Sequence, residues 1–154
     1  MTGLSIGGPA PDFTLRDQFG QDVALSSFVG SKAVLLVFYP YAFSNVCTGE
    51  MSQIRSRLDE FMTFGTEILA ISCDPMHSLR AFADADGLNF PLLSDFWPHG
   101  AVTRAYEVFD DAKGRPRRSS YVVDKAGKVA WSVHNPTSQG RDLDEHLRQL
   151  QEVA

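Results

Sequence analysis

The residue best placed for chemistry is Cys47, which lies in the stretch FYPYAFSNVCTGE, residues 38–50. An apolar run ends at Pro40, and from Ser44 onwards apolar residues recur every three or four positions, as on one face of a helix. Cys47 therefore falls in the first helical turn, where free N–H groups and the helix dipole favour an anion such as a thiolate. Alternatively, Cys47 simply begins the buried face of the helix, since buried unreactive cysteine is common. The spacing alone leaves both interpretations open.

A reactive thiol at this position would need help from other groups. Ser44 is predicted to cap the helix by accepting a hydrogen bond from the N–H of Val46 or Cys47. At pH 7 a thiol of pKa about 8.5 is roughly 3% ionised, so full ionisation raises the reactive species only about thirty-fold. A fast cysteine enzyme must also stabilise the charge that moves during reaction. We therefore look for a hydroxyl, free N–H groups and a guanidinium.

Length and composition favour one domain over residues 1–154. The chain has 154 residues, of which 44% are hydrophobic and 21% charged, and its net charge of -5 argues against a nucleic-acid partner. It has no apolar run of the ~20 residues needed to cross a bilayer, and its N-terminal residues lack the pattern of a secretory signal. Its two cysteines are too few for a disulfide scaffold, and no Cys or His spacing indicates zinc. We expect a cytoplasmic protein without a metal or cofactor.

Strand and helix patterns alternate along the first two thirds of the chain. A hairpin is predicted at 12–15 and 22–25, with buried strands at 32–39 and 67–74 and a shorter strand at 90–95. Helices are predicted at 44–64, 76–87, 99–109 and 141–153, and a late antiparallel hairpin at 119–124 and 128–134. This order indicates a three-layer α/β/α fold with a mixed sheet. It is the order of a thioredoxin-like domain with an N-terminal β-hairpin extension.

The residues around Cys47 resemble the active-site motif of the peroxiredoxin family. Its pattern P-x-x-x-T/S-x-x-C is matched by Pro40, Ser44 and Cys47, and its late arginine by Arg118 in RRSSYVVD. The opening PAPDFTLRD, the run VLLVFYP and the residues TGE are also similar, so the resemblance covers nearly the whole chain. The segment FPLLSDFWPHGAV is closest to the AhpE-type one-cysteine peroxiredoxins.

The resemblance implies a thiol-dependent peroxidase. Cys47 would be the peroxidatic nucleophile, which attacks one peroxide oxygen and becomes a sulfenic acid. Ser44 would bind the peroxide and the thiolate, and Pro40 would shield the thiolate from water. Arg118 would supply the fixed cation, and Glu50 would orient it. The substrates would be hydrogen peroxide, organic hydroperoxides and peroxynitrite.

Each of these supporting residues also has a plain structural interpretation. Pro40 can simply end a strand, and Ser44 can simply cap a helix. Without the resemblance, Arg118 would be a solvated member of the basic cluster KGRPRR, and Glu50 an exposed helix acid. The motif also departs from its more frequent form, because serine replaces threonine and loses the methyl that restrains the rotamer.

Resolution of the sulfenic acid is predicted to need an external thiol. Ser52 stands where some peroxiredoxins carry a resolving cysteine, which implies a one-cysteine cycle. Candidate reductants are mycothiol with a mycoredoxin, thioredoxin, glutathione or another low-molecular-weight thiol. Cys73, at the end of the second buried strand, is the alternative resolving residue, although a buried structural role is favoured.

The sequence also allows two other classes of function. A thiol–disulfide oxidoreductase of the same fold would carry C-x-x-C, yet its first cysteine position is Ser44 here. A non-catalytic binding module would not need Ser44, Cys47 and Arg118 together. The resemblance implies a homodimer, in which Phe96 and Trp97 could form the interface or, equally, belong to the core. The four histidines show no metal spacing and are expected at the surface or as caps.

Overall fold

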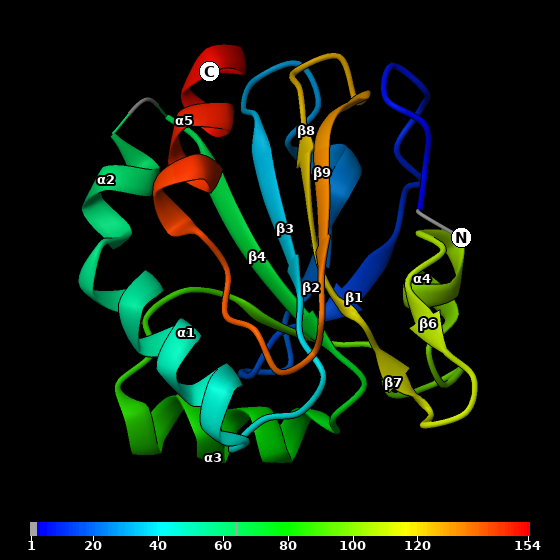
Figure 1. Ribbon diagram of the computed structural model, residues 1–154, viewed down its shortest axis with the longest axis vertical. Helices are drawn as coiled ribbons and strands as arrows, with labels where there is room; N and C mark the ends of the chain where they lie inside the picture. The colour runs from blue at the N-terminus through cyan, green and yellow to red at the C-terminus, as the bar shows by residue number, and fades with distance from the viewer. Residues whose placement is uncertain (1–2, 64) are drawn as a thin grey trace.

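The computed structural model describes residues 3–63 and 65–154. Figure 1 shows a single twisted sheet with helices on both of its sides. Its seven strands follow the order β2-β1-β5-β4-β3-β8-β9, and β6 pairs with β7 in a separate ribbon. β3, β4 and β5 run parallel, whereas β8 is antiparallel to β3 and β9 antiparallel to β8. The sheet is therefore mixed, as the sequence predicts.

Most element bounds lie within two residues of the predicted ones, and the helices predicted at 44–64 and 99–109 are the exceptions. The strands are β1 (Thr14–Arg16), β2 (Asp22–Ala24), β3 (Val34–Phe38), β4 (Glu67–Ser72), β5 (Leu92–Ser94), β6 (Phe109–Asp110), β7 (Arg115–Pro116), β8 (Arg118–Val123) and β9 (Val129–Asn135). The helices are α1 (Asn45–Ser56), α2 (Leu58–Met62), α3 (Met76–Asp86), α4 (Ala101–Ala105) and α5 (Leu143–Val153), with a 3-10 turn at Leu25–Ser27.

The central strand β3 is buried on both faces, as its continuous apolar run predicts. Leu35 and Val37 face a core cluster that includes residues of α1, α2, α3 and α5. Leu36 and Phe38 face a second cluster built on the N-terminal segment and the region of α4. Successive side chains of a strand point to opposite faces, so one short run supplies both cores. The thioredoxin-like three-layer fold is confirmed.

The N-terminal hairpin is also confirmed. β1 and β2 pair antiparallel, and β1 joins the main sheet through Arg16 and Ser94 of β5. The side chain of Asp17 accepts bonds from the N–H groups of Phe19 and Gln21, at 2.8 and 3.0 Å. These bonds close the connection that the sequence RDQFGQ predicts as a turn.

The prediction of one continuous helix over 44–64 is wrong, because the segment forms two helices, α1 and α2. The chain leaves helical geometry at Arg57, which has φ -110° and ψ 14°, and this residue separates α1 from α2. The guanidinium of Arg57 bonds both Glu60 of α2 and Asp144 of α5, which holds the bend against the C-terminal helix. Phe64, the predicted helix end, lies outside the described residues.

The predicted helix over 99–109 is too long. α4 covers only Ala101–Ala105, and Phe109 begins the ribbon in which it pairs with Pro116. Thr103 and Tyr106 are buried three residues apart, as in a helix, whereas Tyr106 and Val108 are buried two residues apart, as in an extended segment. The ribbon extends from the side of the sheet that α4 covers and leads directly into β8 (Figure 1).

Within the described ranges 3–63 and 65–154, no helix combines the length and the apolar character needed to cross a membrane.

Candidate active site

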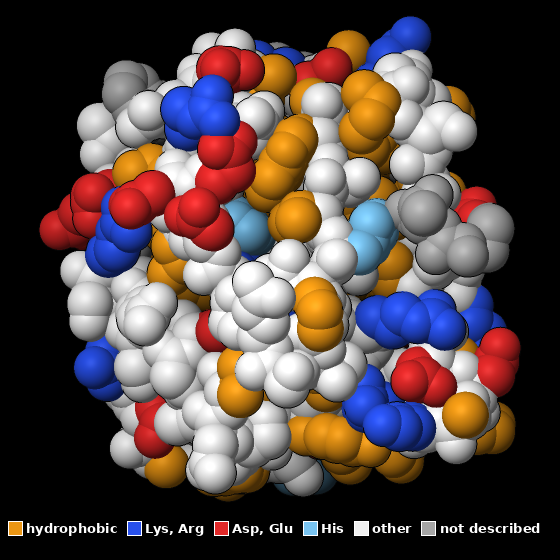
Figure 2. Space-filling view, in the orientation of Figure 1, with side chains coloured by type: hydrophobic (Ala, Val, Ile, Leu, Met, Phe, Trp, Pro, Cys, Tyr) orange, Lys and Arg blue, Asp and Glu red, His pale blue; other side chains and the backbone are white. Residues whose placement is uncertain are grey.

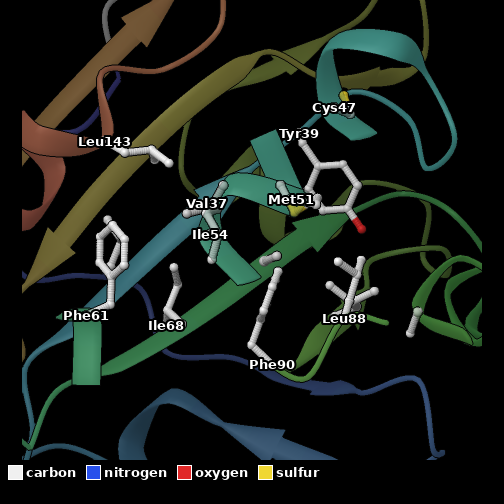
Figure 3. Close-up of a cluster of buried hydrophobic side chains, with 14 of the residues drawn as sticks. Val37, Tyr39, Cys47, Met51, Ile54, Phe61, Ile68, Leu88, Phe90 and Leu143 are labelled. Carbon is white, nitrogen blue, oxygen red and sulfur yellow. The ribbon is translucent and has the colours of Figure 1, made fainter. Parts of the chain in front are cut away.

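Cys47 is the third residue of α1, which begins after the loop that follows β3. Its side chain is fully buried and belongs to the core cluster between the sheet and α1. Figure 3 draws it at one end of that cluster, beside Tyr39. The structural interpretation of Cys47 is therefore correct as far as packing goes. It does not exclude chemistry, because the sulfur also contacts a charged group.

Ser44 stands at the N-cap position, but the predicted capping bond is wrong. Its backbone carbonyl accepts from the N–H of Thr48 at 2.8 Å, which begins the helix. Its hydroxyl makes no capping bond and instead donates to the carbonyl of Tyr41 at 3.1 Å. The N–H groups of the first turn therefore receive no side-chain cap from Ser44. Such N–H groups can stabilise a negative charge at the start of the helix.

Arg118 reaches this site from the far part of the chain. It is the first residue of β8, and the next residue, Ser119, pairs with Phe38 at the end of β3. The pairing places Arg118 beside the loop that leads into α1. Its Nη2 lies 3.4 Å from the sulfur of Cys47. Its Nε and Nη2 also donate to the carbonyl of Thr137, at 3.2 and 3.0 Å, which fixes the plane of the guanidinium.

Glu50 is buried rather than exposed, one turn after Cys47 on α1. Its carboxylate accepts bonds from two guanidinium groups, those of Arg118 and Arg141. A carboxylate shared by two arginines holds both in one geometry, because charge-assisted bonds are short and directional. Glu50 therefore orients the cation that contacts Cys47.

Arg141 is a member of the site that the sequence analysis missed. Its side chain is fully buried, and burial lowers the pKa of its guanidinium to about 10, with Glu50 opposing that effect. It therefore stays protonated at neutral pH. It donates to the backbone carbonyls of Phe38 and Ser119, at the point where β3 pairs with β8. No spacing rule marks an arginine that precedes a helix by two residues, so only the fold reveals it.

A hydrogen-bonded chain continues from Arg141 to His146. The Nε of Arg141 donates to the hydroxyl of Ser120 at 3.0 Å, and that hydroxyl lies 2.7 Å from Nε2 of His146. The Nδ1 of His146 is 2.6 Å from the carbonyl of Asp142, which can only accept, so Nδ1 carries the proton. The expectation that all four histidines lie at the surface or as caps is therefore wrong for His146, which is buried.

A pocket of about 250 Å³ opens beside these groups. Its lining comes from the β3–α1 loop, the start of α1, β7, β8 and the loop after β9: Pro40, Tyr41, Ser44, Asn45, Val46, Arg115, Arg118 and Thr137. Cys47 lies behind this lining, and Arg118 is the side chain that touches both the sulfur and the pocket. The structure thus brings together Pro40, Ser44, Cys47, Glu50 and Arg118, as the resemblance implies.

Comparison with known proteins agrees with this geometry. The family model described as AhpC/TSA family matches residues 6–132. The chain belongs to that family. It is 46% identical over 139 residues to alkyl hydroperoxide reductase E of Mycobacterium tuberculosis, covering 90% of this chain and 91% of that protein. It is 34% identical over 156 residues to the chloroplastic 2-Cys peroxiredoxin BAS1 of Arabidopsis thaliana, covering 95% of this chain and 58% of that protein.

Solved structures of peroxiredoxins share the fold. The reduced 2-Cys peroxiredoxin of Plasmodium vivax superposes with a TM-score of 0.87 at 30% identity, over 96% of this chain and 81% of that chain. Peroxidoxin BcpB of Mycobacterium tuberculosis superposes with a TM-score of 0.87 at 29% identity, over 98% of this chain and 99% of that chain. The protein is a thiol-dependent peroxidase of the peroxiredoxin family, acting on peroxides and depending on a thiol reductant.

The second cysteine of this peroxiredoxin lies apart from the first. Cys73 follows β4, and its sulfur is 4.0 Å from the hydroxyl of Thr103 in α4, on the opposite side of the sheet from α1. Burial, together with the nearby charge of Asp95, raises the pKa of the Cys73 thiol to about 12. A thiol that stays protonated is a poor nucleophile.

Phe96 and Trp97, for which the sequence allows either an interface or a core position, lie at the surface. Trp97 is 81% exposed and Phe96 47% exposed, so neither belongs to the core of the chain. Among the described residues, no group of three or more His, Cys, Asp or Glu side chains is arranged to hold a metal ion.

Proposed function

We propose that Cys47 is the peroxidatic cysteine of this peroxidase and that Arg118 is its principal electrostatic partner. The observation that carries the proposal is the 3.4 Å contact between Nη2 of Arg118 and the sulfur of Cys47 at the wall of the pocket. The bonds of Arg118 to Thr137 and Glu50 hold this cation beside the sulfur. The cation stands where negative charge moves from sulfur to oxygen during reaction.

The remaining residues take supporting roles. Ser44 is half-buried in the pocket wall, where its hydroxyl can turn from the Tyr41 carbonyl to a peroxide oxygen. Pro40 is buried and offers no N–H, so it limits the approach of water to the sulfur. Glu50 keeps Arg118 in place and does not contact the reacting atoms.

The reaction balances with these groups. The thiolate attacks the terminal oxygen of the peroxide, an S–O bond forms, and the O–O bond breaks. Sulfur is oxidised by two electrons to the sulfenic acid. With a hydroperoxide the leaving oxygen takes up the proton lost by the thiol and departs as water or an alcohol, and with peroxynitrous acid the leaving group is nitrite. Hydrogen peroxide, organic hydroperoxides and peroxynitrite are the proposed substrates.

We propose a one-cysteine cycle for the return step. An external thiol would attack the sulfenic acid, releasing water and forming a mixed disulfide that a second thiol reduces. The position of Cys73 beside α4, across the sheet from α1, supports this cycle over an internal disulfide. Mycothiol with a mycoredoxin, thioredoxin and other low-molecular-weight thiols are the proposed reductants, in a cytoplasmic setting.

The whole chain, residues 1–154, is proposed to act as one domain, and two copies as a homodimer. The exposed Phe96 and Trp97 support an association of copies, because large aromatic residues are enriched at interfaces. Sedimentation of the wild-type protein and of Trp97→Lys tests this. A dimer that the substitution separates agrees with the proposal, and a wild-type monomer contradicts it.

Stopped-flow mixing with hydrogen peroxide tests the catalytic proposal. The wild-type protein is expected to react far faster than free cysteine, and Cys47→Ser to lose the reaction. A rate no higher than that of free cysteine would contradict a peroxidatic role for Cys47.

Mass spectrometry after one equivalent of peroxide tests the cycle. A sulfenic acid trapped at Cys47 is expected, and a disulfide between Cys47 and Cys73 would overturn the one-cysteine cycle. Regeneration of the oxidised protein against the panel of thiols then identifies the reductant class.

A further inference from the structure

The pocket contains a second arginine that the reaction described above does not use. Arg115, in β7, lines the pocket together with Arg118. Its guanidinium carbon lies 5.5 Å from the centre of the Tyr41 ring, and Tyr41 lines the same pocket. A cation over an aromatic face is held in a defined place at the pocket mouth.

Arg115 is buried yet has few partners. Its side chain is 6% exposed, and within residues 3–63 and 65–154 its one hydrogen bond runs from Nη1 to the carbonyl of Pro116 at 3.2 Å. Its Nε is buried and makes no hydrogen bond within the described part of the chain. A buried donor without a partner is costly, and an arginine offers five donors in a fork that matches a carboxylate.

The charge of Arg115 is also not balanced locally. Glu50 neutralises one of the two guanidinium groups it contacts, and the Cys47 thiolate neutralises the other. Arg115 then adds a positive charge, and within residues 3–63 and 65–154 no carboxylate forms an ion pair with it or lines the pocket. The pocket of the reactive protein is therefore electropositive.

The surface beside the pocket carries charges of both signs. Lys113 and Arg117 flank β7 and are both exposed. Figure 2 shows Lys and Arg side chains over β6 and β7 on one face of the molecule, with acidic side chains among them. One of these acids, Asp111, forms an ion pair with Arg104 at 2.8 Å. The attraction of the pocket for an anion therefore rests on Arg115 rather than on the exposed charges around it, which salt screens.

The pocket is larger than hydrogen peroxide requires. Its volume of about 250 Å³ corresponds to the liquid volume of roughly eight water molecules. An organic hydroperoxide with a short chain therefore fits, with its peroxide group at Arg118 and its other end within reach of the pocket mouth.

We propose that Arg115 is a specificity-determining residue that binds the carboxylate of an anionic organic hydroperoxide while Arg118 and Cys47 act on its peroxide group. This inference rests on the proposed function and names its preferred substrate class. The step is the one given above: the S–O bond forms, the O–O bond breaks, and the product is the sulfenic acid and a hydroxy acid. Arg115 contributes binding only, and no redox change occurs at the carboxylate.

The test compares two oxidants that carry the same hydroperoxide group and differ at their far end, which is charged in one and neutral in the other. A tertiary alkyl hydroperoxide carrying a carboxylate, and the methyl ester of the same compound, are mixed with wild-type protein in a stopped-flow instrument. The carboxylate form is expected to react about tenfold faster than the ester, since a hydrogen bond to a charged group contributes at least one such factor. This preference should shrink as salt is added. Equal rates for acid and ester would overturn the inference.

Substitutions of Arg115 test whether this residue causes the preference for the carboxylate. Arg115→Gln should abolish the preference for the carboxylate, and Arg115→Lys should restore part of it, because only the charge is retained. A purely structural role of Arg115, such as fixing Tyr41, would change both oxidants equally and leave their ratio intact. That result would contradict the proposal.

Arg117→Gln is the matched control. It removes the same charge two residues away, from a side chain that bonds the carbonyl of Phe109 and lies outside this pocket. Its ratio of acid to ester rates should stay within about twofold of wild type, because an exposed charge at the rim is screened. Hydrogen peroxide is measured in every arm. If it oxidises Cys47 rapidly while the ratio stays at one, the assignment of Arg115 fails and the peroxidase mechanism stands.

Discussion

Arg141 binds Glu50 through both its backbone N–H, at 2.7 Å, and its guanidinium, at 2.5 Å. The same carboxylate also holds Arg118, the arginine that contacts Cys47. One acidic side chain of α1 thus fixes two cations that come from β8 and from the segment before α5. The position of Arg118 beside Cys47 therefore depends on its ion pair with Glu50, which does not itself contact the reacting sulfur.

Glu50→Gln is expected to destabilise the folded protein and to slow the oxidation of Cys47 by hydrogen peroxide. The substitution leaves two buried guanidinium groups without their counter-ion, and breaking a buried pair in this way costs about 3–5 kcal/mol. Urea unfolding measures the loss, and stopped-flow oxidation by hydrogen peroxide should show at least a tenfold lower rate. Glu60→Gln is the control, because Glu60 is 51% exposed and, among the described residues, forms an ion pair with Arg57 alone. Its cost should stay below about 1 kcal/mol. Equal effects of the two substitutions would contradict the role of Glu50.

Arg118→Gln is expected to lower the rate constant with hydrogen peroxide by about 10²–10³, the size of effect seen when one charge-stabilising donor is removed. Arg118→Lys should recover little, because lysine cannot bond Thr137, Glu50 and Cys47 in one plane. The readout is the bimolecular rate constant of Cys47 oxidation. Arg148→Gln, at a side chain that is 61% exposed on α5, should leave it unchanged. A loss of less than tenfold in Arg118→Gln would remove Arg118 from the catalytic step.

Cys73 is expected to react slowly with alkylating agents. With its pKa raised to about 12, only about one part in 10⁴ is thiolate at pH 8. In the Cys47→Ser variant, iodoacetamide should therefore label Cys73 about a thousandfold more slowly than a free thiol. The same variant in concentrated urea provides the control and should be labelled at the rate of free cysteine. Labelling of the folded protein within tenfold of that rate would show that Cys73 is accessible and ionised.

His146 is expected to make stability depend on pH between about 4 and 6.5. Burial, with Arg141 nearby, lowers the pKa of this imidazole to about 4. The unfolded chain binds a proton here below about 6.5, whereas the folded protein does not until about pH 4. Its contribution to stability is thus fully present above pH 6.5 and is lost as the pH falls. The total loss is about 3 kcal/mol.

Chemical denaturation of wild type and His146→Gln at several pH values measures the pH-dependent contribution of His146 to stability. The difference between their free energies of unfolding should shift by about that amount from pH 7 to pH 4. Because other groups titrate in both proteins, only the difference reports on His146. A difference that does not change with pH would contradict a buried neutral imidazole.

Local sequence determined most of the fold and the location of the reactive sulfur. The unbroken apolar run over Val34–Phe38 indicates a strand covered on both faces, and the change of period after Pro40 places Cys47 at a helix start. These features are local, because the spacing of side chains along a strand or helix is set by neighbouring residues. The sequence also named Arg118 and Glu50, although only through resemblance.

The tertiary structure decided which distant groups meet the sulfur. Arg118, Arg115 and Thr137 reach the pocket because β8 pairs with β3 and because β7 and the loop after β9 lie beside it. Arg141 reaches Glu50 from the segment before α5. No sequence period encodes such a meeting, since it depends on strand pairing between segments about seventy residues or more apart. The side-chain bonds of Ser44 and His146, which overturned two expectations, were likewise settled by packing.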